Sequence, residues 1–118
     1  MFVEKLSRIS DRIGGTLALS LVARDGIPVS SVASDPDLDL DLLAAELIAQ
    51  ARAVTENHRD LHMGELLQFS VSTDRLTLIV STVAPEYYLL LVLGPEGNLG
   101  RARFELKRAR LLLEPDLI

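Results

Sequence analysis

The stretch from Tyr87 to Leu93 is the feature that most constrains the fold of this 118-residue chain. It contains only aromatic and aliphatic residues, so both faces of an extended strand would be apolar here. Such a strand must be covered on both sides, which places it at the centre of a sheet with helices on each face. It is far shorter than the ~20 residues that a membrane-spanning helix requires.

The spacing of apolar residues predicts the other elements. Asp25-Gly26 is typical of a tight hairpin between two strands, because both residues tolerate positive φ. Apolar residues spaced three and four apart indicate helices, and alternation indicates strands. We expect a helix from residue 2 to Gly14-Gly15, strands over 16–23 and 27–33, a helix over 40–57, strands over 66–72, 75–83 and 87–93, and a helix from Leu99 that ends before Pro115.

Two of these strands are expected at sheet edges. Pro28 has no N–H to donate to a neighbouring strand, so the second strand should lie at one edge. In the third strand, apolar Leu67, Phe69 and Val71 alternate with Gln68 and Ser70, which predicts one buried face. This strand has no proline, so it offers an open edge for pairing.

Composition narrows the class of protein. Hydrophobic residues make up 48% and charged residues 25% of the chain, with a net charge of -5, as in an ordinary globular domain. The mild acidity argues against general nucleic-acid binding, and the absence of cysteine excludes disulfides and thiolate metal sites. No signal peptide or transmembrane segment is recognised. We therefore expect a single domain over residues 1–118, located in the cytoplasm.

The expected middle helix has two apolar faces. The broader face, large enough to cover one face of the sheet, consists of Leu40, Leu43, Ala44, Leu47, Ile48, Ala51 and Val54. The opposite side carries an outer stripe of smaller residues, Leu42, Ala45, Ala49 and Ala53, flanked by Glu46, Gln50 and Arg52. A second copy of the same helix would cover this stripe, which predicts a homodimer. Alternatively, the alanines serve only helix propensity on a solvated face.

These features together resemble the roadblock family, the dynein light chain type, across nearly the whole chain. The resemblance rests on the hairpin Asp25 to Val29, the alanine-rich middle helix, and the run from Gly64 through Leu99-Gly100-Arg101 into the last helix. No single motif is specific, but their order along the chain is.

The resemblance implies an α+β fold: a three-layer α/β/α sandwich with a five-stranded antiparallel sheet in order 2-1-5-4-3. Two helices would cover one face and the middle helix the other. Family members dimerise through the middle helix and third strand, here Leu42, Ala45, Ala49, Ala53, Gln68 and Ser70. They include scaffolds of GTPase complexes and bacterial gliding-motility regulators that activate a Ras-like GTPase. The resemblance implies no catalytic residue and no cofactor.

Several possible ligand sites have weaker support. Asp35, Asp37, Asp39, Asp41 and Glu46 have the spacing of a calcium loop, but Leu40 stands where such a loop needs glycine. His58 and His62 lack a third zinc ligand. Gly94, Gly97 and Gly100 do not form a dinucleotide-binding motif and fit a strand-to-helix turn better. We expect no metal site.

The sequence thus favours a non-catalytic homodimer that binds a partner protein near Glu46, Gln50 and Arg52. The resemblance implies that this partner is a small GTPase. An alternative is a domain that senses a small molecule or an anion, because five basic residues fall on the last helix. With Lys5, Arg8 and Arg12 of the first helix they predict a basic side, which either meets a partner or membrane or is simply solvated.

Overall fold

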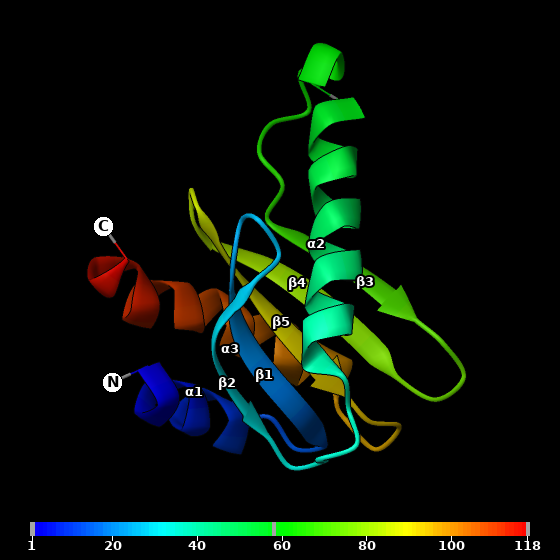
Figure 1. The fold of residues 1–118 in the computed structure, drawn as a ribbon, viewed down its shortest axis with the longest axis vertical. Helices are drawn as coiled ribbons and strands as arrows, with labels where there is room; N and C mark the ends of the chain where they lie inside the picture. The colour runs from blue at the N-terminus through cyan, green and yellow to red at the C-terminus, as the bar shows by residue number, and fades with distance from the viewer. Residues whose placement is uncertain (1, 58, 118) are drawn as a thin grey trace.

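The computed structural model describes residues 2–57 and 59–117 (Figure 1). It contains three α-helices, two short 3-10 helices and five strands. In chain order they are α1 (Phe2–Asp11), β1 (Thr16–Ala23), β2 (Pro28–Ala33), α2 (Leu40–Asn57), η1 (Arg59–Leu61), β3 (Gln68–Ser72), β4 (Thr77–Ala84), β5 (Tyr87–Leu93), α3 (Leu99–Leu113) and η2 (Glu114–Asp116). Among the described residues, no helix is both long and apolar enough to cross a bilayer.

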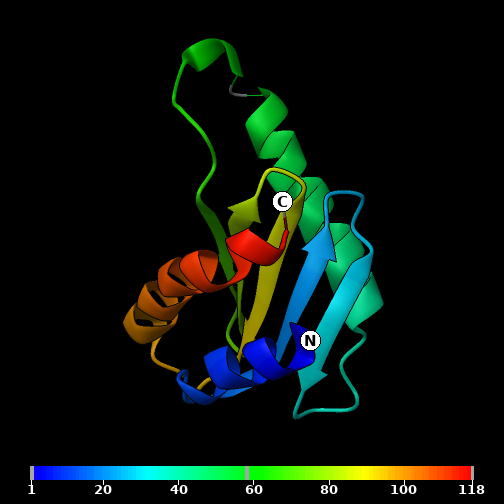
Figure 2. The ribbon, with the colours of Figure 1, turned by 90° about the vertical axis from the view of Figure 1, so that its left-hand side faces the viewer.

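The strands form one antiparallel sheet in the order β2-β1-β5-β4-β3. The expected strand order is therefore confirmed, with β5 at the centre and β2, which begins at Pro28, at one edge. Helices α1 and α3 cover one face of the sheet and α2 covers the other (Figure 2). This is the three-layer sandwich expected from the sequence.

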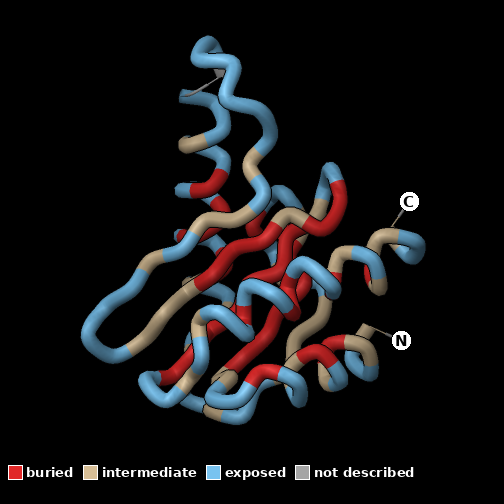
Figure 3. The backbone as a smooth tube through the Cα atoms, turned by 180° about the vertical axis from the view of Figure 1, so that it is seen from behind, coloured by how far each residue is buried: buried red, intermediate tan, exposed pale blue. Residues whose placement is uncertain are grey.

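Each face of the sheet has its own hydrophobic core, and β5 contributes to both. Leu89 and Leu91 pack towards α1 and α3, against Leu6 and Leu106 among others. Leu90 packs towards α2, in the core that contains Ala44, Leu47, Ile48 and Ala51. The buried segments lie in the central strands and on the inner sides of the helices (Figure 3).

Local hydrogen bonds fix the predicted turns and helix starts. Asp25 Oδ1 accepts from the Ile27 N–H, and Gly26 has φ 89°, as the hairpin requires. Asp39 Oδ1 accepts from the Leu42 N–H at 3.1 Å, and Asn98 Oδ1 accepts from the Arg101 N–H at 3.0 Å. These two side chains cap the N-termini of α2 and α3.

Three expectations at element ends are wrong in detail. The first helix ends at Asp11, because hydrogen bonds from Arg12 to Ile9 and from Ile13 to Ser10 tighten the chain into a turn. The fourth strand begins only at Thr77, since a turn closed by a hydrogen bond from Thr73 to Leu76 precedes it.

The third expectation that fails concerns Leu67, which was placed on the buried face of the third strand. Its side chain is 54% exposed, whereas Leu66 packs against the α2 core. The strand ladder starts one residue later, with Gln68 opposite Ser81. Strand alternation therefore does not apply to Leu67.

Candidate protein-interaction surface

The two faces of α2 differ as its sequence predicts. Ala44, Leu47, Ile48 and Ala51 are buried against the sheet. All four residues of the outer stripe, Leu42, Ala45, Ala49 and Ala53, are exposed in the single chain. Leu42 is the largest of them and has 57% of its surface exposed. The structure therefore brings the stripe residues together on an accessible face, as helical periodicity requires.

The β1–β2 turn borders the outer stripe. At Gly26, a Cβ atom would lie 3.3 Å from the Cα atom of Ala45. Glycine at this position therefore lets the turn approach the helix closely, in addition to permitting its positive φ. The Ala45 end of the stripe is thus supported by the turn.

The sheet has two edges, β2 and β3, and β3 pairs only with β4. Phe69 and Val71 point to the α2 face, where they pack against its core. Gln68 and Ser70 line a hollow on the opposite face with Arg103, and the Gln68 amide donates to the Arg103 carbonyl at 3.4 Å. The side chains of Gln68 and Ser70 are therefore not brought next to the outer stripe. Only the backbone edge of β3 is available to join a sheet.

The three predicted partner-binding residues are all exposed on α2. Glu46 and Gln50 fall on one side of the outer stripe and Arg52 on the other, from the helical spacing. They surround an apolar strip with polar groups of both signs. This arrangement is typical of a protein-binding surface, in which a polar rim surrounds an apolar centre.

The acidic run before α2 is occupied with local backbone contacts. Asp35 Oδ1 accepts from the Asp37 N–H at 3.0 Å, and Asp39 caps the helix. Among residues 2–57 and 59–117, no group of three or more acidic or histidine side chains is placed to hold a metal ion. The interpretation of His58 as a zinc ligand concerns a residue outside the described part of the chain, whereas its suggested partner His62 lies in the segment after η1.

The glycine-spaced segment before α3 is a turn that serves packing. The Gly97 N–H donates to the Gly94 carbonyl at 3.0 Å. A Cβ atom at Gly97 would lie 2.2 Å from Cγ of Leu93, which is buried in the core. Glycine is therefore required here for space, as expected of a strand-to-helix turn.

A cleft of about 490 Å³ lies beside the C-terminal end of α2. Its lining includes Arg24, Tyr88 and Arg110, together with the segment from His62 to Leu66. Pockets of this volume accommodate small ligands. Both arginines already have acidic neighbours, because Arg24 lies 3.7 Å from Glu86 and Arg110 lies 3.4 Å from Glu114.

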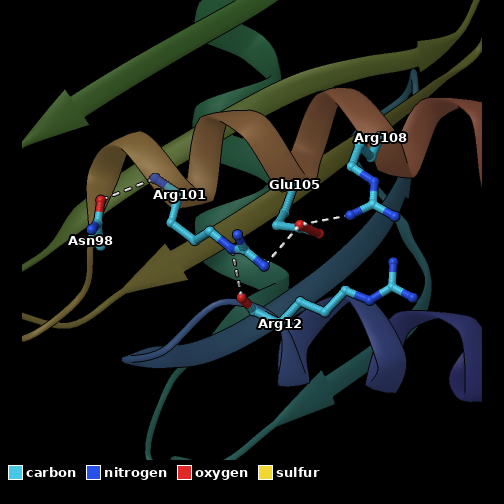
Figure 4. A network of polar contacts seen from close by, with 5 residues as sticks. All are labelled: Arg12, Asn98, Arg101, Glu105 and Arg108. Carbon is cyan, nitrogen blue, oxygen red and sulfur yellow. Dashed lines mark hydrogen bonds and ion pairs between the residues drawn. The ribbon is translucent and has the colours of Figure 1, made fainter.

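Sequence reasoning missed a buried carboxylate between α1 and α3. Glu105 lies on α3 with only 1% of its surface exposed, and its Oε1 atom accepts from Arg108 at 3.2 Å and lies 3.4 Å from Arg101 (Figure 4). Arg101 also donates to the Arg12 carbonyl at the end of α1. The basic residues at positions i−4 and i+3 were the available signal, since those positions are neighbours on a helix.

Known proteins resemble this chain in three dimensions. No protein-family model matches its sequence, and no curated protein is significantly similar to it. Among solved structures, a Roadblock/LC7 domain from Streptomyces avermitilis has a TM-score of 0.87 at 23% identity, covering 98% of this chain and 96% of that one. This likeness confirms the roadblock fold.

Two further solved structures, of MglB and of MglC, have the same fold. MglB, in a structure described as a tetrameric arrangement, has a TM-score of 0.85 at 23% identity, covering 94% of this chain and 83% of that one. MglC from Myxococcus xanthus has a TM-score of 0.72 at 28% identity, covering 98% of each chain. The chain thus shares its fold with these two proteins along nearly its whole length.

Proposed function

We propose that this chain, which has the fold of Roadblock/LC7 domains, is a non-catalytic regulator that forms a homodimer and binds a Ras-like small GTPase. The observation that supports it best is the exposed outer stripe of α2, on the helix whose opposite side covers the sheet. Solvated helices normally present polar residues outwards, so an apolar strip on the outer side favours a second, protein-covered face.

In the proposed dimer, two α2 helices pack along their outer stripes and two β3 edges pair to extend the sheet. The alanines let the helix backbones approach closely, and pairing satisfies the unpaired backbone groups of the β3 edge. Gln68 and Ser70 then contribute through their backbone position at the seam. A tetrameric arrangement, as described for MglB, is compatible with such self-association.

Light scattering coupled to size exclusion tests the dimer. The Ala49→Glu variant places a charge at the centre of the outer stripe, where a dimer would bury it without a partner. Such a charge costs ~3–5 kcal/mol, against ~8 kcal/mol for a micromolar interaction. We expect the wild type to be a dimer and this variant a monomer near 12.9 kDa with an unchanged fold. The control variant Gln50→Glu adds the same charge on the exposed side of α2, beside the stripe, and should remain dimeric.

A wild type that is already monomeric, or an Ala49→Glu variant that dimerises as well as Gln50→Glu, would remove α2 from the interface. The fold of the subunit should persist in either case, because Ala49 points away from the buried Ala44, Leu47 and Ala51. Circular dichroism of both variants checks this directly.

The GTPase is proposed to lie across the paired α2 helices. A gene for a Ras-like GTPase next to the gene of this protein would supply the natural candidate, acting with this protein in the cytoplasm. We expect Glu46→Arg and Arg52→Glu to weaken GTPase binding while the dimer remains intact, because both side chains are exposed beside the stripe. Titration of the GTPase loaded with GDP or with a non-hydrolysable GTP analogue measures this. Equal affinity for wild type and both variants would exclude the α2 surface.

A second candidate function is a sensor for a small anionic molecule, favoured by the cleft lined by Arg24 and Arg110. It predicts a rise in melting temperature with a small-molecule ligand. Loss of that rise in Arg24→Ala would locate the ligand in the cleft, whereas a GTPase that binds α2 without any ligand favours the first proposal.

A further inference from the structure

The layer formed by α1, α3 and η2 differs in charge from the rest of the protein. Together with Arg12, which directly follows α1, this layer carries eight of the twelve basic residues but only five of the seventeen acidic residues, which gives it a net charge of +3. The remainder of the chain therefore carries a net charge of -8. The overall charge of -5 is the sum of a basic layer and an acidic remainder. This basic layer occupies one side of the sheet, opposite α2 (Figure 2).

The outermost line of α3 is apolar. Ala102, Leu106 and Ala109 face the core, and from the helical spacing Phe104 and Leu111 lie on the opposite side of α3. Phe104 is 53% exposed and Leu111 is 78% exposed. We call this pair the α3 crest. Two large apolar side chains thus project from the most basic helix of the protein.

Cations flank the α3 crest on both sides. The guanidinium carbon of Arg101 lies 6.0 Å and that of Arg108 5.8 Å from the centre of the Phe104 ring, within the range of cation–π attraction. On the other flank, Arg103 and Lys107 line a hollow with Phe104. These two side chains form no ion pair within the described part of the chain.

α1 extends the same basic surface. Arg8 and Arg12 line the shallow hollow between α1 and α3, together with Arg108 and Leu111 of the crest side. Neither Arg8 nor Arg12 is in an ion pair with another described residue. Lys5 is paired with Asp116, so it contributes less to the positive charge of this surface. The unpaired cations therefore lie on both sides of the crest.

The shape of this surface distinguishes between two kinds of acidic partner. An acidic peptide in the hollow between α1 and α3 would meet the carboxylate of Glu105, which also lines that hollow. The α3 crest itself consists of two exposed apolar side chains between cations. This is the arrangement of helices that lie in a membrane interface, with apolar side chains among the acyl chains and basic ones at the headgroups.

The net negative charge does not prevent such docking. The acidic residues of α2 and its flanking loop lie across the sheet from α3, about 20 Å away if each layer adds ~10 Å. The Debye length at physiological ionic strength is ~8 Å, so their repulsion is largely screened, while cations of the α3 crest flanks lie at the surface itself.

We propose that the α1–α3 face docks on an anionic lipid surface, with Phe104 and Leu111 entering the interface and the flanking cations binding lipid phosphates. The surface is complete in one chain, so docking requires neither the dimer nor a GTPase. It assigns a partner to the face opposite α2.

Flotation with lipid vesicles tests the proposal. The probes are vesicles of phosphatidylcholine alone and of phosphatidylcholine mixed with phosphatidylglycerol. We expect the wild type to bind only the mixed vesicles, and less at high salt. The double variant Arg103→Glu/Lys107→Glu should bind at least about 25-fold more weakly, at about fivefold for each lost cation. Phe104→Ser/Leu111→Ser should also weaken binding.

The control is Arg52→Glu/Arg75→Glu, which makes the same change in net charge at exposed positions on α2 and in the β3–β4 turn. It should bind the mixed vesicles within about twofold of the wild type, since these cations lie outside the docking face. Circular dichroism verifies that all three double variants are folded.

Three results would overturn the proposal. The first is a wild type that ignores the mixed vesicles at low salt. The second is equal weakening in the Arg52→Glu/Arg75→Glu control, which would reduce the effect to net charge. The third is a wild type that binds soluble polyglutamate but no vesicles, together with an Arg103→Glu/Lys107→Glu variant that no longer binds polyglutamate. That result would assign the face to an acidic protein partner.

Discussion

Three glycines in this chain differ in two respects: whether their φ is unfavourable for a residue with a side chain, and whether there is space for a Cβ atom. Gly15 has φ 83°, and a Cβ atom there would lie 2.7 Å from both the Cα and N atoms of Gly97. Gly64 has a similar φ of 90° but nothing within 4 Å of such an atom. Gly14 has neither constraint, because its φ is not positive and the space around it is open. Comparison of the three alanine variants therefore separates the two contributions.

We expect Gly64→Ala to lower the free energy of unfolding by ~1–2 kcal/mol, the cost of placing a Cβ in the left-handed region. Gly15→Ala adds a collision with the backbone of Gly97, which must shift, for a further ~1–3 kcal/mol. Its total is ~2–5 kcal/mol. Gly14→Ala should be neutral or stabilise by up to ~1 kcal/mol, because it restricts only the unfolded chain.

Urea unfolding followed by circular dichroism measures the three values at one fixed protein concentration, because dimerisation would shift the midpoint. In melting temperature, Gly15→Ala should lie ~8–20 °C below the wild type, at ~4 °C per kcal/mol for a domain of this size. A Gly15→Ala variant as stable as Gly14→Ala would refute the reasoning. Equal losses in Gly15→Ala and Gly64→Ala would refute only the contact with Gly97.

Three further predictions concern the capping, ion-pair and acidic residues. Asn98→Ala should cost ~1 kcal/mol in urea unfolding through loss of the α3 N-cap. Glu105→Met should change the free energy of unfolding by less than ~1 kcal/mol, because Arg101 and Arg108 are half-exposed and stay hydrated. Arg101→Ala/Arg108→Ala leaves the buried carboxylate without a partner and should cost ~3–5 kcal/mol. Similar losses in both variants would contradict this expectation. Calorimetry with calcium should give no stoichiometric binding, and a tight site abolished by Asp37→Ala would restore the calcium-loop interpretation.

Element positions were predictable because several local signals agree in this chain. The strand Thr16–Ala23, the helix Leu40–Asn57 and the helix Leu99–Leu113 have the bounds that periodicity and capping residues predict. The centrality of β5 followed from a single physical requirement, the burial of both faces. Where local and tertiary constraints agree in this way, the sequence alone is sufficient to locate the helices and strands.

The failures occur where a residue's environment depends on a distant part of the chain. Leu67 continues the alternation of β3, but the strand pairing begins only at Gln68, opposite Ser81. Glu105 appears solvated from its charge, yet the approach of α1 buries it beside two arginines. The pair Gly14-Gly15 likewise predicts a turn without indicating which glycine meets the loop at Gly97. Only Glu105 has a local signal, its basic neighbours at positions i−4 and i+3, and the other two contacts leave none.

The two proposed surfaces are linked by symmetry. If two β3 edges pair antiparallel about a two-fold axis, that axis is normal to the sheet, so like faces of the two subunits stay on the same side. Both α2 helices would then lie on one side of the joined sheet and both α3 crests on the other side. A dimer would therefore meet a lipid surface with two basic faces at once, and binding through two faces exceeds binding through one by avidity. Ala49→Glu, which leaves α3 untouched, should consequently weaken binding to mixed vesicles by at least ~10-fold, while Gln50→Glu should not. If vesicle binding is the same in both variants although only Ala49→Glu is monomeric, the two α3 crests do not share one side, and pairing through β3 is excluded.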